Sequence, residues 1–140
     1  IGVDLSSQML AQARMLGAYD GLCRANILDT IPGYNLKVFD LVIAADVFVY
    51  IGDLSLVFKY IVSALRAPSK IAFTIENLKD EQQSYVLQNS GRYAHSIKYI
   101  AKICDQFGLN ICTMDQVILR KNNDHDINGL LYILEFNHTN

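Results

Sequence analysis

The stretch FDLVIAAD, residues 39–46, decides the fold of this chain. Its apolar centre, residues 41–45, is bounded by an aspartate on each side. A continuous apolar run of this length is typical of a strand that is buried on both faces of a parallel sheet. In such sheets, ligands bind beyond the carboxyl ends of the strands. We therefore expect Ala44, Ala45 and Asp46 to lie at the edge of a binding site.

The composition is that of a single globular domain spanning residues 1–140. Hydrophobic residues make up 51% of the 140 residues and charged residues 19%, which excludes a disordered chain. The net charge of −2 predicts no nucleic-acid partner, because proteins that bind nucleic acids carry a basic patch or stripe. No apolar run approaches the roughly 20 residues that span a bilayer, so no membrane segment is expected. Cys23, Cys104 and Cys112 are widely spaced, which predicts reduced thiols and a cytoplasmic location.

The first residues predict a short strand followed by a helix. Residues 1–4 form the strand, and Ser6 or Ser7 is a suitable N-cap for a helix that ends at Gly17. Asp4 therefore lies at the tip of a strand. A carboxylate in that position binds ribose hydroxyls in Rossmann-like sheets, although Asp4 could equally be a turn or capping residue.

The segments on either side of FDLVIAAD predict further strands and a helix. Residues 22–28 are typical of a second strand, in which Asn26 is polar and could simply cap the strand end. Residues 29–33 then form a predicted turn, because they contain Pro-Gly. After the central strand, residues 47–51 continue it, and Asp53 caps a helix with a regular apolar face.

The second half of the chain also alternates between predicted strands and predicted helices. Pro68 ends the helix, and residues 70–76 predict another buried strand that finishes in an acid. Residues 77–90 are polar and predict a solvated loop. A further helix begins at Ser96 and ends at Gly108.

The last two predicted strands fix the fold class. Residues 109–119 and 130–136 are apolar, and a short polar turn at residues 122–124 joins them. Two strands with so short a connection must be antiparallel. The sequence therefore predicts an α/β fold with a mostly parallel sheet, helices on both faces and a C-terminal antiparallel hairpin.

These features resemble a class I S-adenosylmethionine-dependent methyltransferase over nearly the whole chain. IGVD followed by LSSQML is similar to the segment after the family's glycine-rich motif, and FDLVIAAD resembles its fourth strand. The stretches YDGLCRANILD, FDLVIAADVFVYIGDL, FTIE, YVLQNSGRYAHS and ILRKN resemble predicted methyltransferases that often have tetratricopeptide repeats upstream. The glycine-rich loop and the strand before it have no match in residues 1–140. The resemblance therefore implies a truncated Rossmann-like methyltransferase domain.

The resemblance also implies a cofactor, S-adenosylmethionine, and residues that hold it. Asp4 would bind the ribose, and Met9 would flank the adenine or the ribose. Asn26 would accept a hydrogen bond from the adenine amino group, and Ile27 would supply a backbone N–H. The methionine moiety and the methyl group would lie against Ala44, Ala45 and Asp46.

The methyl acceptor is expected to be a small molecule or a protein side chain. His95 and Tyr93 are the candidate catalytic residues, with Glu76 and Asp46 as further candidate bases; a general base is optional in methyl transfer. His95 could instead bond a loop at the start of a helix, and Tyr93 could be a packing aromatic. Arg92 and Tyr50 are the candidate acceptor-binding residues, although Arg92 could form a surface ion pair. The three scattered histidines predict no metal site.

Two other hypotheses remain open at this stage. The chain could be a non-catalytic remnant or interaction module that keeps the sheet but has lost the cofactor. It could also be a nicotinamide-binding half-domain, which is disfavoured because G-x-G-x-x-G is missing and the closing hairpin is foreign to that fold. If the sheet lacks a strand, Val3 and Val42 flank an open slot. Unpaired edges invite pairing with another chain, so we expect a homo-oligomer.

Overall fold

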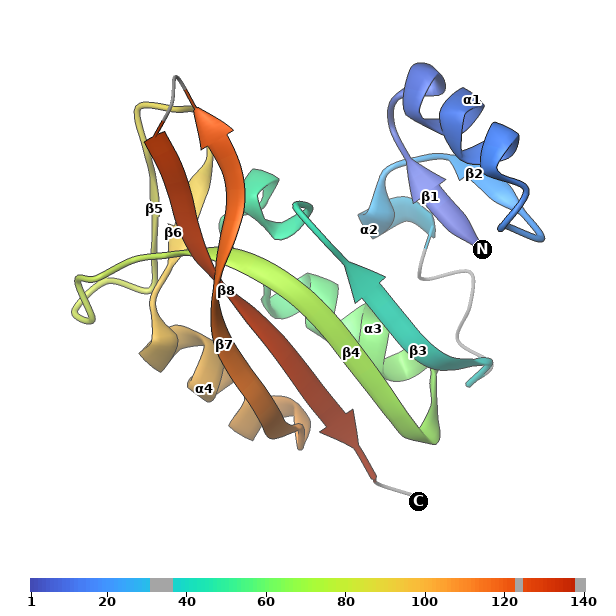
Figure 1. The fold of residues 1–140 in the computed structure, drawn as a ribbon. Helices are drawn as coiled ribbons and strands as arrows, with labels where there is room; N and C mark the ends of the chain where they lie inside the picture. Colours follow the sequence, from blue (N-terminus) through green and yellow to red (C-terminus); the bar gives the residue numbers. More distant parts are fainter. Residues whose placement is uncertain (31–36, 123–124, 138–140) are drawn as a thin grey trace.

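The computed structural model describes residues 1–30, 37–122 and 125–137 of the chain (Figure 1). The proline and glycine of the predicted turn at residues 29–33 lie outside the described residues, as does most of the turn at residues 122–124. The described strands form a two-stranded sheet near the N-terminus and a six-stranded sheet. None of the described helices is long and apolar enough to cross a membrane.

The N-terminal unit consists of β1 (Gly2–Asp4), α1 (Ser7–Leu16) and β2 (Leu22–Arg24). β1 and β2 are parallel, with α1 as the crossover between them. The predicted caps are confirmed: the Ser6 hydroxyl accepts a hydrogen bond from the Met9 amide, and Gly17 adopts a left-handed φ of 63°. Serine favours the N-cap of a helix and glycine favours the C-cap, and both preferences are local. Both caps could therefore be predicted without knowledge of tertiary contacts.

The second predicted strand is shorter than expected, because its end forms a helix. The strand predicted over residues 22–28 stops at Arg24, and α2 (Ile27–Thr30) follows. Asn26 provides the reason, since its Oδ1 accepts a hydrogen bond of 2.9 Å from the Leu28 amide at the helix start. Ile27 and Leu28 then pack against the main core, which attaches the N-terminal unit to it.

The larger sheet is mixed and not mostly parallel, which corrects the prediction. Its strands follow the order β5-β6-β4-β8-β7, with β3 also paired to β4. β4 is parallel to β3 and to β6, whereas the pairs β4–β8, β5–β6 and β7–β8 are antiparallel. The predicted C-terminal hairpin is confirmed. The bounds are β3 (Phe39–Ala44), β4 (Leu65–Asn77), β5 (Tyr85–Leu87), β6 (Tyr93–His95), β7 (Asn110–Asn122) and β8 (His125–Phe136).

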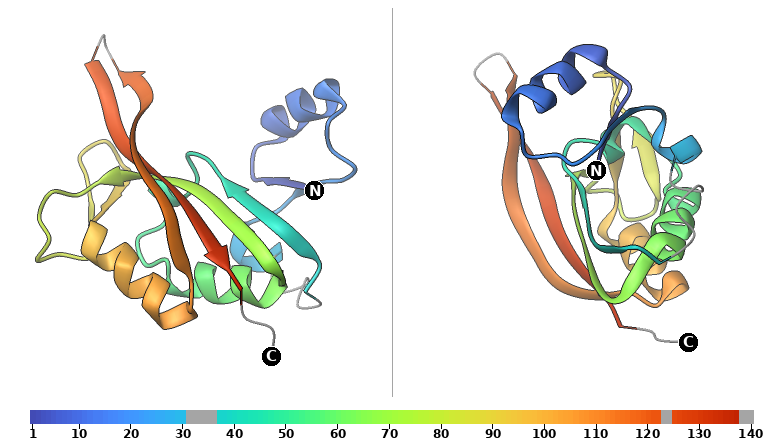
Figure 2. Two further views of the ribbon diagram at one scale, coloured as in Figure 1. Left: turned by 60° about the horizontal axis from the view of Figure 1, so that its bottom comes forward. Right: turned by 90° about the vertical axis from the view of Figure 1, so that its right-hand side faces the viewer.

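Helices α3 (Ser55–Ala64) and α4 (Ile97–Phe107) both cover the same face of the larger sheet (Figure 2). This corrects the prediction of helices on both faces for these two helices. The core between these helices and the sheet is apolar and rich in aromatic rings. Phe73 on β4 lies at its centre, with ring centroids 5.2 Å from Phe48, 5.5 Å from Phe58 and 5.1 Å from Tyr132. Ser96 and Gly108 cap α4 as predicted.

The central strand ends earlier than the sequence suggested. Residues 47–51 do not continue β3 but form a turn and the 3₁₀ helix η2 (Phe48–Tyr50). Asp46 adopts a left-handed φ of 54°, which turns the chain out of the sheet. Aspartate is one of the few residues other than glycine that adopts this conformation readily. The Asp46 amide donates to the Thr74 hydroxyl at 2.9 Å, which holds the turn on β4.

Two further segments differ from the prediction. β4 begins at Leu65 and contains Pro68, so the helix before it ends at Ala64 rather than at the proline. The strand accepts proline because the β3–β4 register shifts in this region. The predicted loop over residues 77–90 contains β5, which pairs with β6 in antiparallel fashion. β5 is only the three residues YVL within an otherwise polar segment, which is too short a run to predict a strand, and its pairing depends on β6 being held beside the end of β4.

Candidate functional site

The carboxyl ends of β1 and β3 lie on the same side of the molecule. β1 and β3 run in the same general direction in the views of Figures 1 and 2. Asp4 is the last residue of β1, and Asp46 follows the end of β3. The structure therefore directs both of these strand ends, at which the sequence predicted a ligand, to the same side of the molecule.

Asp4 and Met9 share one hollow in the N-terminal unit. This hollow has a volume of about 140 Å³, and Gly2, Leu10 and Tyr19 also line it. Oδ1 of Asp4 accepts a hydrogen bond of 2.7 Å from the Ser6 amide. Within the described part of the chain, no hydrogen bond is made by its Oδ2. Asp4 is thus a turn residue that still has an unused carboxylate oxygen.

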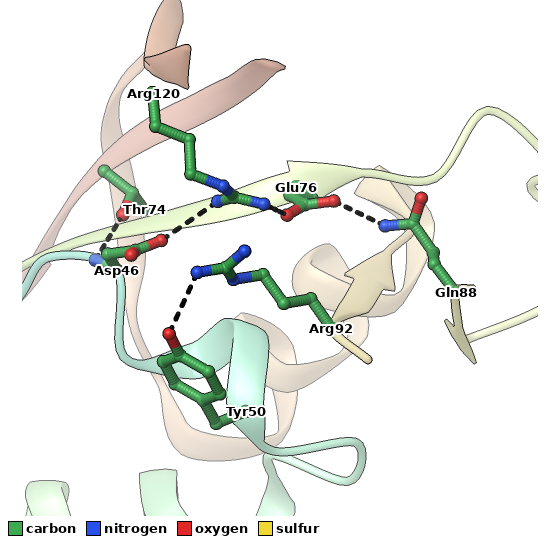
Figure 3. A network of polar contacts seen from close by, with 7 residues as sticks. All are labelled: Asp46, Tyr50, Thr74, Glu76, Gln88, Arg92 and Arg120. Atoms are coloured by element: carbon green, nitrogen blue, oxygen red, sulfur yellow. Dashed lines mark hydrogen bonds and ion pairs between the residues drawn. The ribbon is translucent and has the colours of Figure 1, made fainter. Parts of the chain in front are cut away.

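The other predicted cofactor residues lie at the starts and ends of neighbouring elements. Asn26 caps α2 with its side-chain oxygen, and Ile27 is the first residue of that helix. Ala44 is buried at the end of β3, whereas Ala45 is exposed. Asp46 is half exposed, and its carboxylate points along the sheet end towards β4 (Figure 3).

A group of polar side chains, which we call the rim cluster, lies beside Asp46 on β4 and β7, just after β5 and just before β6 (Figure 3). Its members are Asp46, Tyr50, Thr74, Glu76, Gln88, Arg92 and Arg120. Nη1 of Arg120 is 3.2 Å from Oδ1 of Asp46, and Nη2 of the same side chain pairs with Oε1 of Glu76. Glu76 is only 6% exposed, and its second oxygen accepts a hydrogen bond from Gln88.

Sequence reasoning missed Arg120 and Gln88. Arg120 lies on β7, one residue beyond the strand predicted over residues 109–119. Its partner Asp46 is 74 positions away, so no local spacing links the two residues. The available signals were the resemblances of ILRKN, which contains Arg120, and of YVLQNSGRYAHS, which contains Gln88, to the methyltransferase group.

Arg92 and Tyr50, the two candidate acceptor-binding residues, contact each other. Nη2 of Arg92 donates to the Tyr50 hydroxyl at 3.1 Å, and the guanidinium carbon lies 5.5 Å from the centre of the Tyr50 ring. The hydrogen bond to Tyr50 raises the pKa of Arg92 above its usual range, and the charges of Asp46 and Glu76 add to this effect. Nε of Arg92 is buried and has no hydrogen-bond partner among the described residues.

His95 is fully buried and bonds a loop. Its Nε2 lies 3.0 Å from the carbonyl oxygens of both Ile51 and Gly52. Both neighbours are acceptors, so Nε2 carries the proton. Burial lowers the pKa of His95, which favours this neutral form. The geometry matches the alternative considered for this residue, a histidine that bonds a loop at the start of a helix.

Tyr99 extends this arrangement to the start of α3. Its ring stacks on His95 with an interplanar angle of 15°. Its hydroxyl donates to Asp53 at 2.9 Å and accepts from the Leu54 amide at 2.8 Å. Burial raises the pKa of Tyr99 to about 12. Tyr93 packs edge to face on Tyr85, with ring centroids 6.1 Å apart.

A second and larger hollow, of about 460 Å³, lies between residues 81–84 and α4. Its lining includes Glu81, Lys98 and Asp105 but no member of the rim cluster and no predicted cofactor residue. Glu81 accepts a hydrogen bond of 2.9 Å from the Lys98 amide there. Its size alone therefore does not make it the functional site. The described residues contain no group of three or more His, Cys, Asp or Glu side chains placed to hold a metal ion.

Comparison of solved structures identifies the fold. An S-adenosylmethionine-dependent methyltransferase from Methanosarcina mazei has a TM-score of 0.69 at 14% identity, covering 97% of this chain and 81% of its own. The N-methyltransferase NodS from Bradyrhizobium japonicum, in complex with S-adenosylhomocysteine, has a TM-score of 0.67 at 16% identity, covering 95% and 64%. The [4+2]-cyclase SpnF has a TM-score of 0.70 at 11% identity, covering 97% and 65%. At these identities the similarity shows the fold alone.

Sequence comparison identifies the family. No curated protein sequence matches the chain. The family described as methyltransferase domain matches residues 1–73, which is more than half of the 140 residues. This match includes β1, β2 and β3, whose ends carry Asp4, Asn26 and Asp46. The chain therefore belongs to the methyltransferase-domain family.

Proposed function

We propose that this chain binds S-adenosylmethionine and transfers its methyl group to a small-molecule or protein acceptor. The observation that carries the proposal is that β1, which ends at Asp4, and β3, which Asp46 follows, direct their carboxyl ends to one side of the molecule. Membership of the methyltransferase-domain family supports it. The solved neighbours, among them a methyltransferase that holds S-adenosylhomocysteine, add support at the level of the fold.

The residues present fit a nucleoside. Asp4 has one carboxylate oxygen unused by the described residues, and it faces the same hollow as Met9. A carboxylate accepts hydrogen bonds from the two hydroxyls of a ribose, and a thioether packs well against an aromatic base. Asn26 and Ile27 would hold the base at the start of α2. Ala44, Ala45 and Asp46 would lie against the methionine moiety.

Methyl transfer depends more on the orientation of the cofactor and the acceptor than on the transfer of a proton. When bound, the cofactor supplies a methyl group on a positively charged sulfur, and the protein contributes position and electrostatics. The Thr74 hydroxyl accepts from the Asp46 amide and Arg120 donates to its carboxylate, so both the backbone and the side chain of Asp46 are positioned. The small, exposed side chain of Ala45 leaves the strand end open to a ligand.

The candidate bases have different geometries. Glu76 is engaged by both Arg120 and Gln88, so its oxygens already have partners. We propose that His95 is a positioning residue, because its protonated nitrogen holds Ile51 and Gly52 next to Tyr50. Tyr93 remains a candidate for the acceptor side. A general base is optional and depends on the acceptor.

Calorimetric titration with S-adenosylhomocysteine tests the proposal. We expect measurable heat and an increase in the melting temperature, because a ligand that binds only the folded state stabilises it. Absence of both at millimolar ligand would reject cofactor binding by this chain. That result would instead favour the alternative, a methyltransferase-like interaction module.

We further propose a homo-oligomer that forms through the edge of β3. In the described structure, β3 pairs only with β4 and β1 pairs only with β2, so each has an unpaired edge. Leu41 and Ile43 of β3 are 52% and 69% exposed. A second copy offers edges and apolar side chains of the same kind. The truncated single domain over residues 1–140, the cytoplasmic location and the association with tetratricopeptide repeats stay predictions.

A further inference from the structure

The two guanidinium groups of the rim cluster have different partners. Arg120 pairs with two carboxylates, Asp46 and Glu76. Arg92 has only the neutral Tyr50 hydroxyl, at 3.1 Å. Within residues 1–30, 37–122 and 125–137, no carboxylate lies at ion-pair distance from Arg92. Figure 3 shows the Arg92 guanidinium beside the Arg120–Glu76 pair, with one nitrogen directed at Tyr50.

The hydrogen-bonding capacity of Arg92 is also incomplete. Its Nε is buried without a partner among the described residues. Native proteins pair nearly all of their buried donors, so an unpaired one requires an explanation. A guanidinium presents its donors in a planar fork that matches the two oxygens of a carboxylate. A carboxylate is therefore a group that would pair with the Nε of Arg92.

The surroundings favour an incoming anion at this place. Arg120 binds Asp46 and Glu76, which reduces their repulsion of a second negative charge. Tyr50 is 59% exposed, so its side chain can turn away from Arg92 without disturbing the core. The contact that an anion would replace is thus one with a neutral, exposed side chain.

The position of Arg92 points to the methyl acceptor. Arg92 directly precedes β6, which pairs with the end of β4 at Glu76 and Asn77. β3 lies between β1 and β4 in Figure 1. The strand that ends at Asp4 is thus on one side of β3, and β6, which Arg92 precedes, is on the other side, beside the end of β4.

We propose that the methyl acceptor of this protein carries a carboxylate, and that Arg92 binds it. This inference rests on the proposed function, since it names the chemical class of the acceptor. The amino-acid part of S-adenosylmethionine also carries a carboxylate. The experiment therefore includes a comparison that separates the two sources.

The direct test observes the Nε–H of Arg92 in the chain saturated with S-adenosylhomocysteine. Sodium acetate is added while the ¹H–¹⁵N correlation of this group, assigned through bonds, is followed by NMR. Acetamide, which has the same shape without the charge, and sodium chloride at equal ionic strength are the controls. We expect a saturable shift with acetate and none with either control. An acetate response that is absent, or matched by chloride, overturns the proposal.

Substitution of Arg92 separates the two carboxylate sources. Affinities for S-adenosylhomocysteine and for 5′-methylthioadenosine, which lacks the amino-acid part, are measured by calorimetry in the wild type and in Arg92→Met. Arg66→Met is the matched control, because it removes an equal charge from the exposed Asp40 pair. We expect both ligands to bind Arg92→Met within about twofold of the wild type. A loss of about tenfold or more for S-adenosylhomocysteine alone assigns Arg92 to the cofactor and overturns the proposal.

An activity assay provides a further test of the proposal. Production of S-adenosylhomocysteine is compared for pairs of carboxylic acids and their amides as acceptors. We expect acids to be preferred, and Arg92→Met to lower kcat/KM for them by about 10- to 100-fold, with Arg92→Lys in between. Amides preferred over acids would overturn the proposal. If the chain binds no S-adenosylhomocysteine at all, the proposed function itself fails, which is a distinguishable result.

Discussion

Nη1 of Arg120 lies 3.2 Å from Oδ1 of Asp46, although 74 positions separate the two residues in the sequence. Arg120 belongs to the C-terminal hairpin and Asp46 to the turn after β3. The same guanidinium also pairs with the buried Glu76 at the end of β4. One side chain therefore joins three strands at the edge where a ligand is expected.

Arg120→Leu should lower the free energy of unfolding by about 3 kcal/mol. The substitution leaves the buried Glu76 without its cation, and loss of one partner of a buried pair is costly. Urea unfolding measures the change. The double variant Arg120→Leu/Glu76→Leu removes both charges and should recover part of the loss. A single variant as stable as the wild type would show that the pair contributes nothing.

Asp4→Ala should weaken the affinity for S-adenosylhomocysteine at least tenfold. The substitution removes the charged acceptor proposed for the ribose. Because Asp4 also accepts a hydrogen bond from the Ser6 amide, Asp4→Asn is the control that keeps this turn contact. Calorimetry on both variants separates the two roles. Unchanged affinity in Asp4→Ala would place the ribose elsewhere.

The buried His95 should make the protein less stable in mild acid. Burial lowers its pKa in the folded state below the reference value of 6.5. Stability is therefore complete above about pH 6.5 and falls as the pH drops from there towards the lower folded pKa, because the unfolded state takes up the proton first.

His95→Gln supplies the comparison for this pH dependence. Its amide replaces the Nε2 donor to the Ile51 and Gly52 carbonyls but does not titrate. Thermal unfolding at several pH values between about 7 and 5 should therefore show a weaker pH dependence in the variant. Parallel curves for the two proteins would contradict the assignment.

Gly129→Ala should destabilise the protein by about 1–3 kcal/mol, as overpacking of a filled site does. Gly129 on β8 pairs with Glu76 on β4. A methyl group there would meet the backbone oxygen of Ile75 and the side chain of Leu119. Gly21→Ala is the matched control, because its methyl group would meet only Ile1 at an ordinary 3.9 Å. Chemical unfolding of both variants measures the difference.

The chain should form dimers or larger species through the exposed edge of β3. Light scattering of the 140-residue chain measures this state directly. Ile43→Lys places a charge on the exposed edge and should shift the population towards monomer, because edge lysines oppose strand pairing. Lys59→Ala, on the exposed side of α3, is a control that leaves the edge unchanged. A monodisperse wild-type monomer would rule out this association.

Local sequence signals determined many features of the fold. The caps at Ser6, Gly17, Ser96 and Gly108 depend on one side chain and its neighbours, so they could be placed from the sequence. The antiparallel C-terminal hairpin could be predicted because only a short segment of sequence connects its two strands. The placement of Asp4 and Asp46 at strand ends also followed, because each acid directly ends an apolar run.

Only the tertiary structure decided how the chain continues beyond those ends. The left-handed turn at Asp46 is held by Thr74, the β5–β6 pair is held beside β4, and His95 is buried by loops from another element. Arg120 reaches Asp46 and Glu76 from a distant strand. Each of these features depends on contacts between residues far apart in the chain. A local pattern predicts what a segment favours by itself, whereas these contacts exist only after the sheet has assembled.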